Sequence, residues 1–325
     1  MQIEKRRLGN TEIYVPRLGL GCATFGREID EQTSFALMDY ALEQGITLFD
    51  TAEAYGGGQA REGRKTRFGI DEEREVSGEF HSSEKIVGRW LRSTGARKQV
   101  VLVSKITTHL TTDHTRSALD ASLERLQTDF LDAYLFHRYD STVPLEESMA
   151  AMHEAQQSGR IRSAGCSNFN LAQLREADGI SKRDGVGRLE VSETIFNLID
   201  RAAKRDILPF CHHRQISFFG YSPLAAGFLT GKYIGVHRIP GSRFDVVPDY
   251  NNLYAGPEKS RIVSDLLAVS GRTGIPAPRL ATAWALSHPE VTTVLVGARS
   301  VQHLQNALAA LDLAGSGSLP EITFA

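Results

Sequence analysis

The chain has 325 residues, of which 41% are hydrophobic and 23% are charged, so it has the composition of an ordinary globular protein with material for a large core. Its 37 Lys and Arg residues nearly balance its 39 Asp and Glu residues, which excludes a strongly basic protein that binds nucleic acid or an anionic membrane. Its apolar runs are far shorter than the roughly 20 residues needed to span a bilayer, which excludes an integral membrane helix.

The first predicted element is a β-hairpin, formed by residues 4–8 and 13–15 around a Gly9-Asn10 turn. Short segments rich in Val, Ile, Leu and Phe follow it, and such near-continuous apolar runs are typical of strands that are buried on both faces. The eight segments are 17–22, 46–50, 100–105, 132–137, 161–166, 189–193, 216–221 and 292–296.

Amphipathic stretches at 31–44, 113–126 and 145–158 alternate with these strands and indicate helices. The alternation predicts repeated βα units. We therefore expect one domain over residues 1–325, an α/β fold of the (β/α)8 TIM-barrel type with an N-terminal β-hairpin.

Two intervals interrupt this alternation. Residues 57–82, after the second strand, are dense in charge and glycine, and their mixed signs predict a solvated or interface loop that covers the substrate mouth or meets a second subunit. Before the eighth strand, a loop at 233–256 precedes helices expected at 257–272 and 276–288. Loops that follow strands lie at the C-terminal face of a barrel, where active sites form.

Four polar residues stand at or just beyond the C-terminal ends of predicted strands. Asp50 ends the segment LFD, Tyr55 follows it, Lys105 ends VLVSK and His137 ends YLFH. Each alone also fits a purely structural role, but a barrel brings all four to one face. An ammonium beside a phenol lowers the pKa of the phenol, so we expect Lys105, held by Asp50, to make Tyr55 a general acid and base. His137 would orient a substrate carbonyl.

With these residues in place, the sequence resembles the aldo-keto reductase superfamily over its whole length, from RRLGNTEIYVPRLGLGCATFG to VLVGARSVQHL. The Asp-Tyr-Lys-His tetrad of that family matches Asp50 and Tyr55 in FDTAEAYG, Lys105 in LVSK and His137 in LFHR. The resemblance implies hydride transfer between a nicotinamide cofactor and a carbonyl, with NADPH/NADP+ as the expected cofactor and NADH/NAD+ as the alternative.

The resemblance also implies which residues bind the cofactor. GRIRSAGCSNF resembles the stretch whose Ser and Asn bond the nicotinamide carboxamide, and YSPL with LTGK resembles the segment that stacks on the ring and faces the pyrophosphate. GARSVQHL resembles the site for the adenosine 2′-phosphate, although a solvated arginine at a helix start is the structural alternative there. The expected cofactor-binding residues are Thr24, Ser167, Asn168, Glu193, Tyr221, Ser222, Pro223, Leu224, Gly227, Lys232, Gly297, Arg299, Ser300 and His303.

The sequence departs from the family pattern at three places. Glu193 stands where a Gln usually contacts the carboxamide, and its negative charge would favour the oxidised, cationic ring, shifting the reaction toward oxidation or tuning the cofactor's potential. The usual His-x-Pro-Asp is replaced by HRYD, which keeps His137 but changes the loop over the substrate. Asn306 and Ala307 stand where Glu and Asn often contact adenine.

Two other patterns are set aside. The glycine-rich GLGCATFG lacks the G-x-G-x-x-G spacing and the acidic partner of a Rossmann fold. Cys211-His212-His213 has no further ligands at metal-site spacing, so we expect no metal. The chain has three cysteines, Cys22, Cys166 and Cys211, which are scattered along the sequence and predict a reducing compartment. Since the N-terminus also lacks a signal-peptide pattern, we expect a soluble, cytoplasmic protein.

The leading hypothesis is an NADP(H)-dependent reductase of aldehydes, ketones or keto-sugars, acting on a small molecule and not on nucleic acid or membrane. Two alternatives stay open. One is a dehydrogenase that oxidises free sugars or polyols with the same residues. The other is a cofactor-sensing regulatory subunit similar to potassium-channel β subunits, with little turnover. A homo-oligomer is compatible with either reading.

Overall fold

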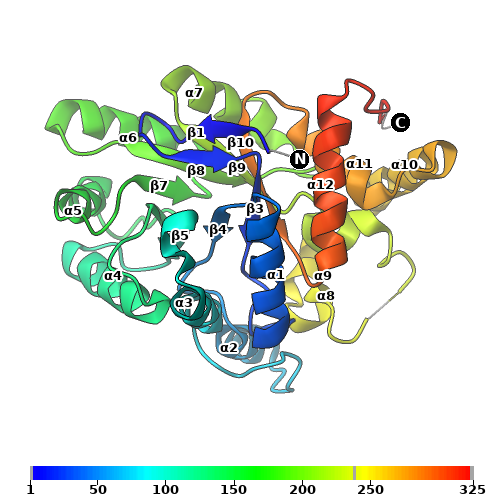
Figure 1. Ribbon diagram of the computed structural model, residues 1–325, viewed down its shortest axis with the longest axis horizontal. Helices are drawn as coiled ribbons and strands as arrows, with labels where there is room; N and C mark the ends of the chain where they lie inside the picture. Colours follow the sequence, from blue (N-terminus) through cyan, green and yellow to red (C-terminus); the bar gives the residue numbers. More distant parts are fainter. Residues whose placement is uncertain (1–2, 237–238, 323–325) are drawn as a thin grey trace.

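The computed structural model describes residues 3–236 and 239–322 and confirms the predicted (β/α)8 barrel as a single domain (Figure 1). Eight parallel strands close in the order β10-β3-β4-β5-β6-β7-β8-β9, with helices around them. Each of the eight predicted segments contains most of one strand, because near-continuous apolar runs are what a strand buried on both faces requires. The barrel strands are β3 (Leu18–Gly21), β4 (Leu48–Asp50), β5 (Val101–Ile106), β6 (Ala133–Phe136), β7 (Ala164–Ser167), β8 (Leu189–Ile195), β9 (Ser217–Tyr221) and β10 (Val291–Gly297).

The N-terminal hairpin closes one end of the barrel. β1 (Lys5–Arg7) pairs antiparallel with β2 (Tyr14–Pro16), as predicted. Leu8, Ile13 and Val15 of the hairpin are buried in the same apolar cluster as residues from strands β4, β5, β6, β8, β9 and β10. This cluster fills the barrel interior from the end where the strands begin, which leaves the C-terminal end for a ligand site.

Helices pack their apolar faces on the outside of the strands, and the second, larger core lies between the two layers. Several begin with a side chain that accepts a hydrogen bond from the first turn, for example Asp30 before α1 and Thr111 before α4. The helices of this outer layer are α1 (Glu31–Glu43), α3 (Ser82–Thr94), α4 (Thr112–Leu126), α5 (Leu145–Gln157), α6 (Leu171–Asp184), α7 (Ile207–Arg214), α11 (Ala277–Leu286) and α12 (Val301–Gly315). Short 3-10 helices are η1 (Ala96–Gln99), η2 (Ala202–Lys204) and η3 (Ala225–Thr230).

Residues 57–82 are not the loop that the sequence led us to expect. They begin with helix α2 (Gly57–Phe68), and the chain then folds back along it. A Cβ on Gly57 would lie 1.7 Å from the carbonyl oxygen of Ser77, so only glycine allows this approach. Arg64 of α2 is buried and pairs at 2.8 Å with Glu75, whose side chain is 2% exposed. Some of the charged side chains in residues 57–82 therefore form an internal ion pair. In the sequence these charges look like those of a solvated loop, so the helix was not predicted.

The interval before β10 holds two short helices, α8 (Arg243–Val246) and α9 (Asp249–Tyr254), and then the predicted pair α10 (Pro257–Thr273) and α11. Aromatic side chains of α8, α9 and η3 stack on one another and form a small separate core with α10 and α11. Residues 237–238 of the expected 233–256 loop lie outside the described residues, as do 1–2 and 323–325 of the expected domain. Among the helices of residues 3–236 and 239–322, none is both long enough and apolar enough to cross a membrane.

Candidate active site

The carboxyl ends of the barrel strands surround a cavity of about 630 Å³. Three of the four expected catalytic residues line it: Asp50 at the end of β4, Tyr55 just beyond it, and His137 directly after β6. The fourth, Lys105 near the end of β5, is fully buried and reaches the site through its contact with Asp50. The structure thus brings together the four residues expected from three neighbouring strands.

The ammonium of Lys105 is held firmly in place. Its Nζ donates to Oδ1 of Asp50 at 2.5 Å and to the carbonyl oxygen of Thr51 at 3.0 Å. Burial works against the charge on Lys105, but the carboxylates of Asp50 and Glu193 outweigh it and raise the pKa of the amine. Lys105 therefore remains an ammonium at any pH at which the fold is expected to work.

Tyr55 lies beside this ammonium, with Nζ of Lys105 5.2 Å from the centre of its ring. Removal from bulk water nevertheless raises the pKa of the phenol, and the opposing effect of Lys105 is smaller. The expectation that Lys105 lowers the pKa of Tyr55 below its ordinary value is thus wrong in its net direction, because the sequence cannot show how dry the site is. At neutral pH Tyr55 is a protonated phenol, which suits a proton donor.

His137 stands edge-on to Tyr55, with ring centres 5.4 Å apart and an angle of 87° between the planes. Burial, followed by repulsion from Lys105 and Arg138, lowers the pKa of His137 to about 3. The imidazole is therefore neutral. Its Nδ1 lies 3.3 Å from Oγ1 of Thr107. If that hydroxyl is the donor, the ring proton stays on Nε2, where it can bond a carbonyl oxygen.

Glu193, on β8, places a second carboxyl next to Lys105. Its side chain is buried, with Oε2 3.3 Å from Nζ of Lys105 and Oε1 accepting from Oγ of Ser167 at 3.5 Å. Burial, and then the nearby carboxylate of Asp50, raise the pKa of Glu193 to about 8 although Lys105 opposes this. Two carboxyl groups share one ammonium at the floor of the cavity.

The wall beside Glu193 is built from the ends of β7 and β9. Tyr221 donates its hydroxyl proton to Oδ1 of Asn168 at 2.7 Å, and the Asn168 amide donates to the carbonyl oxygen of His137 at 3.0 Å. Asn168 and Ser222 have φ values of 62° and 54°, a left-handed conformation that non-glycine residues adopt mainly where the surroundings impose it. The polar atoms of this wall are thus fixed in position.

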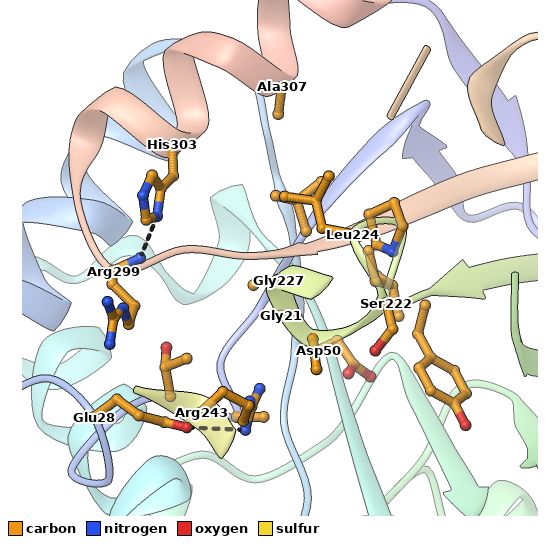
Figure 2. A pocket seen from close by; sticks show the side chains of 18 of the residues that line it. Gly21, Glu28, Asp50, Ser222, Leu224, Gly227, Arg243, Arg299, His303 and Ala307 are labelled. Carbon is orange, nitrogen blue, oxygen red and sulfur yellow. Dashed lines mark hydrogen bonds and ion pairs between the residues drawn. The ribbon is translucent and has the colours of Figure 1, made fainter. Parts of the chain in front are cut away.

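The other end of the cavity is cationic. Lys232, Arg299 and His303 line it, and Figure 2 shows Arg299 and His303 well away from Asp50. Burial and then repulsion from Arg299 lower the pKa of Lys232, and burial, Arg299 and Lys232 together lower the pKa of His303. Groups that repel one another in this way favour the binding of an anion. Ser300, also expected here, is the residue before the first turn of α12; its side chain makes no capping hydrogen bond there, and it does not line the cavity.

One group of lining residues was missed by sequence reasoning. The buried carboxylate of Glu28 pairs with Arg27 at 2.9 Å. It also pairs with Arg243 at 3.2 Å, as Figure 2 shows. Tyr250 lines the cavity nearby. No motif signals this group, since Glu28 and Arg243 lie far apart in the sequence and meet only in the fold.

All but two of the expected site residues line this single cavity; the exceptions are Lys105, beneath the floor, and Ser300. Asn306 and Ala307 also line it, although they match the family pattern less well. The expected residues that line the cavity are Thr24, Asp50, Tyr55, His137, Ser167, Asn168, Glu193, Tyr221, Ser222, Pro223, Leu224, Gly227, Lys232, Gly297, Arg299 and His303.

A family model described as "Aldo/keto reductase family" matches residues 17–316, which is nearly the whole chain. The chain belongs to the aldo-keto reductase family. It is 30% identical to "Aldo-keto reductase YhdN" of Bacillus subtilis (strain 168), over 93% of this chain and 87% of that protein. It is 27% identical to "Aldo-keto reductase yakc [NADP(+)]" of Schizosaccharomyces pombe, over 96% and 87%. A protein of Oryza sativa subsp. japonica named "Probable voltage-gated potassium channel subunit beta" is 29% identical over 96% and 92%.

Membership in the aldo-keto reductase family supports an oxidoreductase. The pattern Cys211-His212-His213 lies elsewhere, in α7, where the cysteine is buried and both histidines are exposed. Within residues 3–236 and 239–322, no group of three or more His, Cys, Asp or Glu side chains is placed to hold a metal ion.

Proposed function

We propose that this protein is an NADP(H)-dependent reductase of aldehydes, ketones or keto-sugars in which Tyr55 is the general acid and base. The observation that supports it is one continuous cavity with the Asp50–Lys105 pair and Tyr55 at its floor and the cations Lys232 and Arg299 at its far end. A dinucleotide phosphate has a reactive ring at one end and anionic groups at the other, which matches this division.

The residues present fit such a cofactor. Tyr221 offers an aromatic face at the end of β9, and Ser167 and Asn168 offer a hydroxyl and an amide for a carboxamide. Arg299 and Lys232 would bind the 2′-phosphate and the pyrophosphate, since a guanidinium and an ammonium are the usual partners of phosphate oxygens. A preference for NADP(H) over NAD(H) follows from the place of Arg299.

When bound, the cofactor supplies a hydride to the carbonyl carbon or takes one from the alcohol carbon. In the reductive direction Tyr55 donates its proton to the carbonyl oxygen, and Lys105 stabilises the phenolate that is left. Asp50 holds Lys105 in place. The neutral His137 donates a hydrogen bond to the same oxygen and orients the carbonyl. In the opposite direction the phenolate of Tyr55 takes the proton of the alcohol.

Burial raises the pKa of the Tyr55 phenol, so the free protein carries the proton that the reductive direction consumes. A sugar or polyol dehydrogenase uses the same residues in reverse. The similarity to a channel β subunit named above favours a third function, a regulatory subunit that senses the cofactor. We take the protein to act on small molecules in the cytoplasm.

The test is a cofactor-oxidation assay of the purified protein with NADPH and a panel of aldehydes, ketones and keto-sugars. We expect steady turnover with at least one class and a loss of about 10²–10⁴-fold in kcat for Tyr55→Phe, with NADPH affinity preserved. Tyr14→Phe is the matched control, because Tyr14 is exposed on the hairpin at the opposite end of the barrel. Full activity in Tyr55→Phe would refute the proposal.

A single stoichiometric oxidation of bound NADPH would favour the sensor, and turnover only with NADP+ and sugars or polyols would favour the dehydrogenase.

A further inference from the structure

Glu193 is a buried carboxyl to which the proposed reaction gives no part. It is 2% exposed and lines the cavity floor. Among the described residues its Oε2 has no hydrogen-bond partner and faces the ammonium of Lys105 at 3.3 Å. Asp50 contacts the same ammonium at 2.5 Å. Two carboxyl groups are therefore paired with one cation in a region removed from water.

The charges of this arrangement do not balance when both carboxyls are ionised. One ammonium neutralises one carboxylate, and an additional buried carboxylate is costly unless it gains a proton or a second positive charge. The two forms of a nicotinamide cofactor differ in this respect, because the oxidised ring is positively charged and the reduced ring is neutral. The reduced ring leaves the excess negative charge in place, whereas the oxidised ring removes it.

We propose that Glu193 adjusts the charge of the site to the oxidation state of the cofactor: it is protonated beside the reduced ring and ionised beside the oxidised ring. Binding of NADP+ then releases one proton to solvent from the Glu193 carboxyl, and binding of NADPH releases none from it. This inference rests on the proposed function, since it requires the nicotinamide ring to lie at the Tyr55 end of the cavity. Its consequence is that rising pH makes the site favour the oxidised cofactor.

The other titratable groups around Glu193 do not change charge near neutral pH. Burial lowers the pKa of His137 to about 3, so it stays neutral. Burial also raises the pKa of Asp50, but its shorter contact with Lys105 makes it the carboxyl that keeps the negative charge of the pair. The pKa values of the neighbouring thiol, phenols and amine are all raised, so these groups stay protonated; they are Cys166, Tyr55, Tyr221 and Lys105.

The first experiment needs no variant. Isothermal titration calorimetry of the wild-type protein near pH 7, in two buffers of different ionisation enthalpy, counts the protons released on binding NADP+ and NADPH. We expect NADP+ to release close to one proton more than NADPH. The 2′-phosphate also titrates near pH 6, but both forms carry it, and its contribution cancels in the difference.

The second experiment measures the ratio of the Kd for NADP+ to the Kd for NADPH between about pH 6 and 8. In the wild type the ratio should fall by up to about tenfold per pH unit, because proton release is linked to binding of the oxidised form. Glu193→Gln should make the ratio independent of pH and weaken NADP+ at pH 8 with little change for NADPH. Glu190→Gln is the matched control: Glu190 lies on the same strand, is also buried, and accepts from the Asn10 amide under the hairpin.

The outcomes separate the two proposals. Equal proton release for both cofactors, or a ratio whose dependence on pH survives in Glu193→Gln, would overturn the role of Glu193 and leave the proposed function standing. Equal weakening of both cofactors by Glu193→Gln would also overturn it, because a steric or hydrogen-bonding role does not distinguish the two rings. Binding of neither form to the wild-type protein would show that the proposed function is wrong, and this inference would fall with it.

Discussion

Arg243, the first residue of α8, pairs with Glu28 on the loop after β3 at 3.2 Å, and both side chains line the cavity. Glu28 is buried and also binds Arg27, so its carboxylate has little contact with water. This contact joins two segments that are far apart in the sequence on the wall of the same cavity. It makes α8 part of the candidate site.

Arg243→Met should therefore speed the release of NADPH. Truncating one partner of a buried charge pair mainly raises the dissociation rate, and we expect an increase of about tenfold. Glu28 keeps Arg27 as a partner, so the fold should persist. Stopped-flow displacement of bound NADPH measures the rate. Arg67→Met is the control, because Arg67 is exposed and pairs with Asp249 outside the cavity lining; an equal effect of both substitutions would contradict the prediction.

Arg64→Met should lower the free energy of unfolding. It leaves Glu75 buried without its cation, a change that costs about 3–5 kcal/mol when a buried pair is broken. NADPH affinity should fall as well, because Nη1 of Arg64 donates to the carbonyl oxygen of Val246 in α8 at 2.9 Å. Urea unfolding and cofactor titration check both. The exposed Arg67→Met should change stability by no more than about 0.5 kcal/mol, and an Arg64 variant of unchanged stability would show that the buried pair is not needed.

Arg299→Ala should reduce the preference for NADPH over NADH, because the guanidinium is the proposed partner of the 2′-phosphate. Loss of a charge-assisted contact of this kind costs about 1.5–3 kcal/mol, which corresponds to roughly 10–150-fold in the ratio of the two Kd values. Ser300→Ala is the adjacent control, since Ser300 does not line the cavity. Fluorescence titration with both reduced cofactors gives the ratio. A ratio that Arg299→Ala leaves unchanged would assign the phosphate to other residues.

The rate of carbonyl reduction should stay high up to alkaline pH. Tyr55 acts in its protonated form, and a pKa raised by burial moves the loss of that form to higher pH. His137, with a pKa of about 3, contributes no step near its ordinary value of 6.5. A plot of log kcat against pH for the wild-type protein tests this, and a limb near pH 6.5 would contradict a neutral His137.

The barrel was predictable from the sequence because its strands follow a simple rule. A strand buried on both faces is mostly apolar, so segments such as VVLVSK stand out, and the polar residues that end several of them mark the open end of the barrel. Asp50, Lys105 and His137 were found in this way. Tyr55 was found because it follows Asp50 closely in the same loop.

Helix α2 could not be predicted by the same reasoning. Its buried side is held by the guanidinium of Arg64 and by close contacts of Gly57, so it has no apolar stripe. The pairing of Glu28 with Arg243 could not be predicted for a different reason, because it depends on how two segments distant in the sequence are placed by the fold. Whether the pKa of Tyr55 is raised or lowered depends on how far water is excluded from the site, and no local sequence pattern indicates this.

Because the hairpin packs against one end of the barrel, that end contributes to stability, while the opposite end carries the cavity. Leu8, Ile13 and Val15 complete the interior packing at one end, so changes there should be felt as lost stability with kinetic constants intact. The loops at the opposite end do not take part in this interior packing. New substrate preferences can therefore arise by exchanging those loops while the scaffold beneath them remains the same.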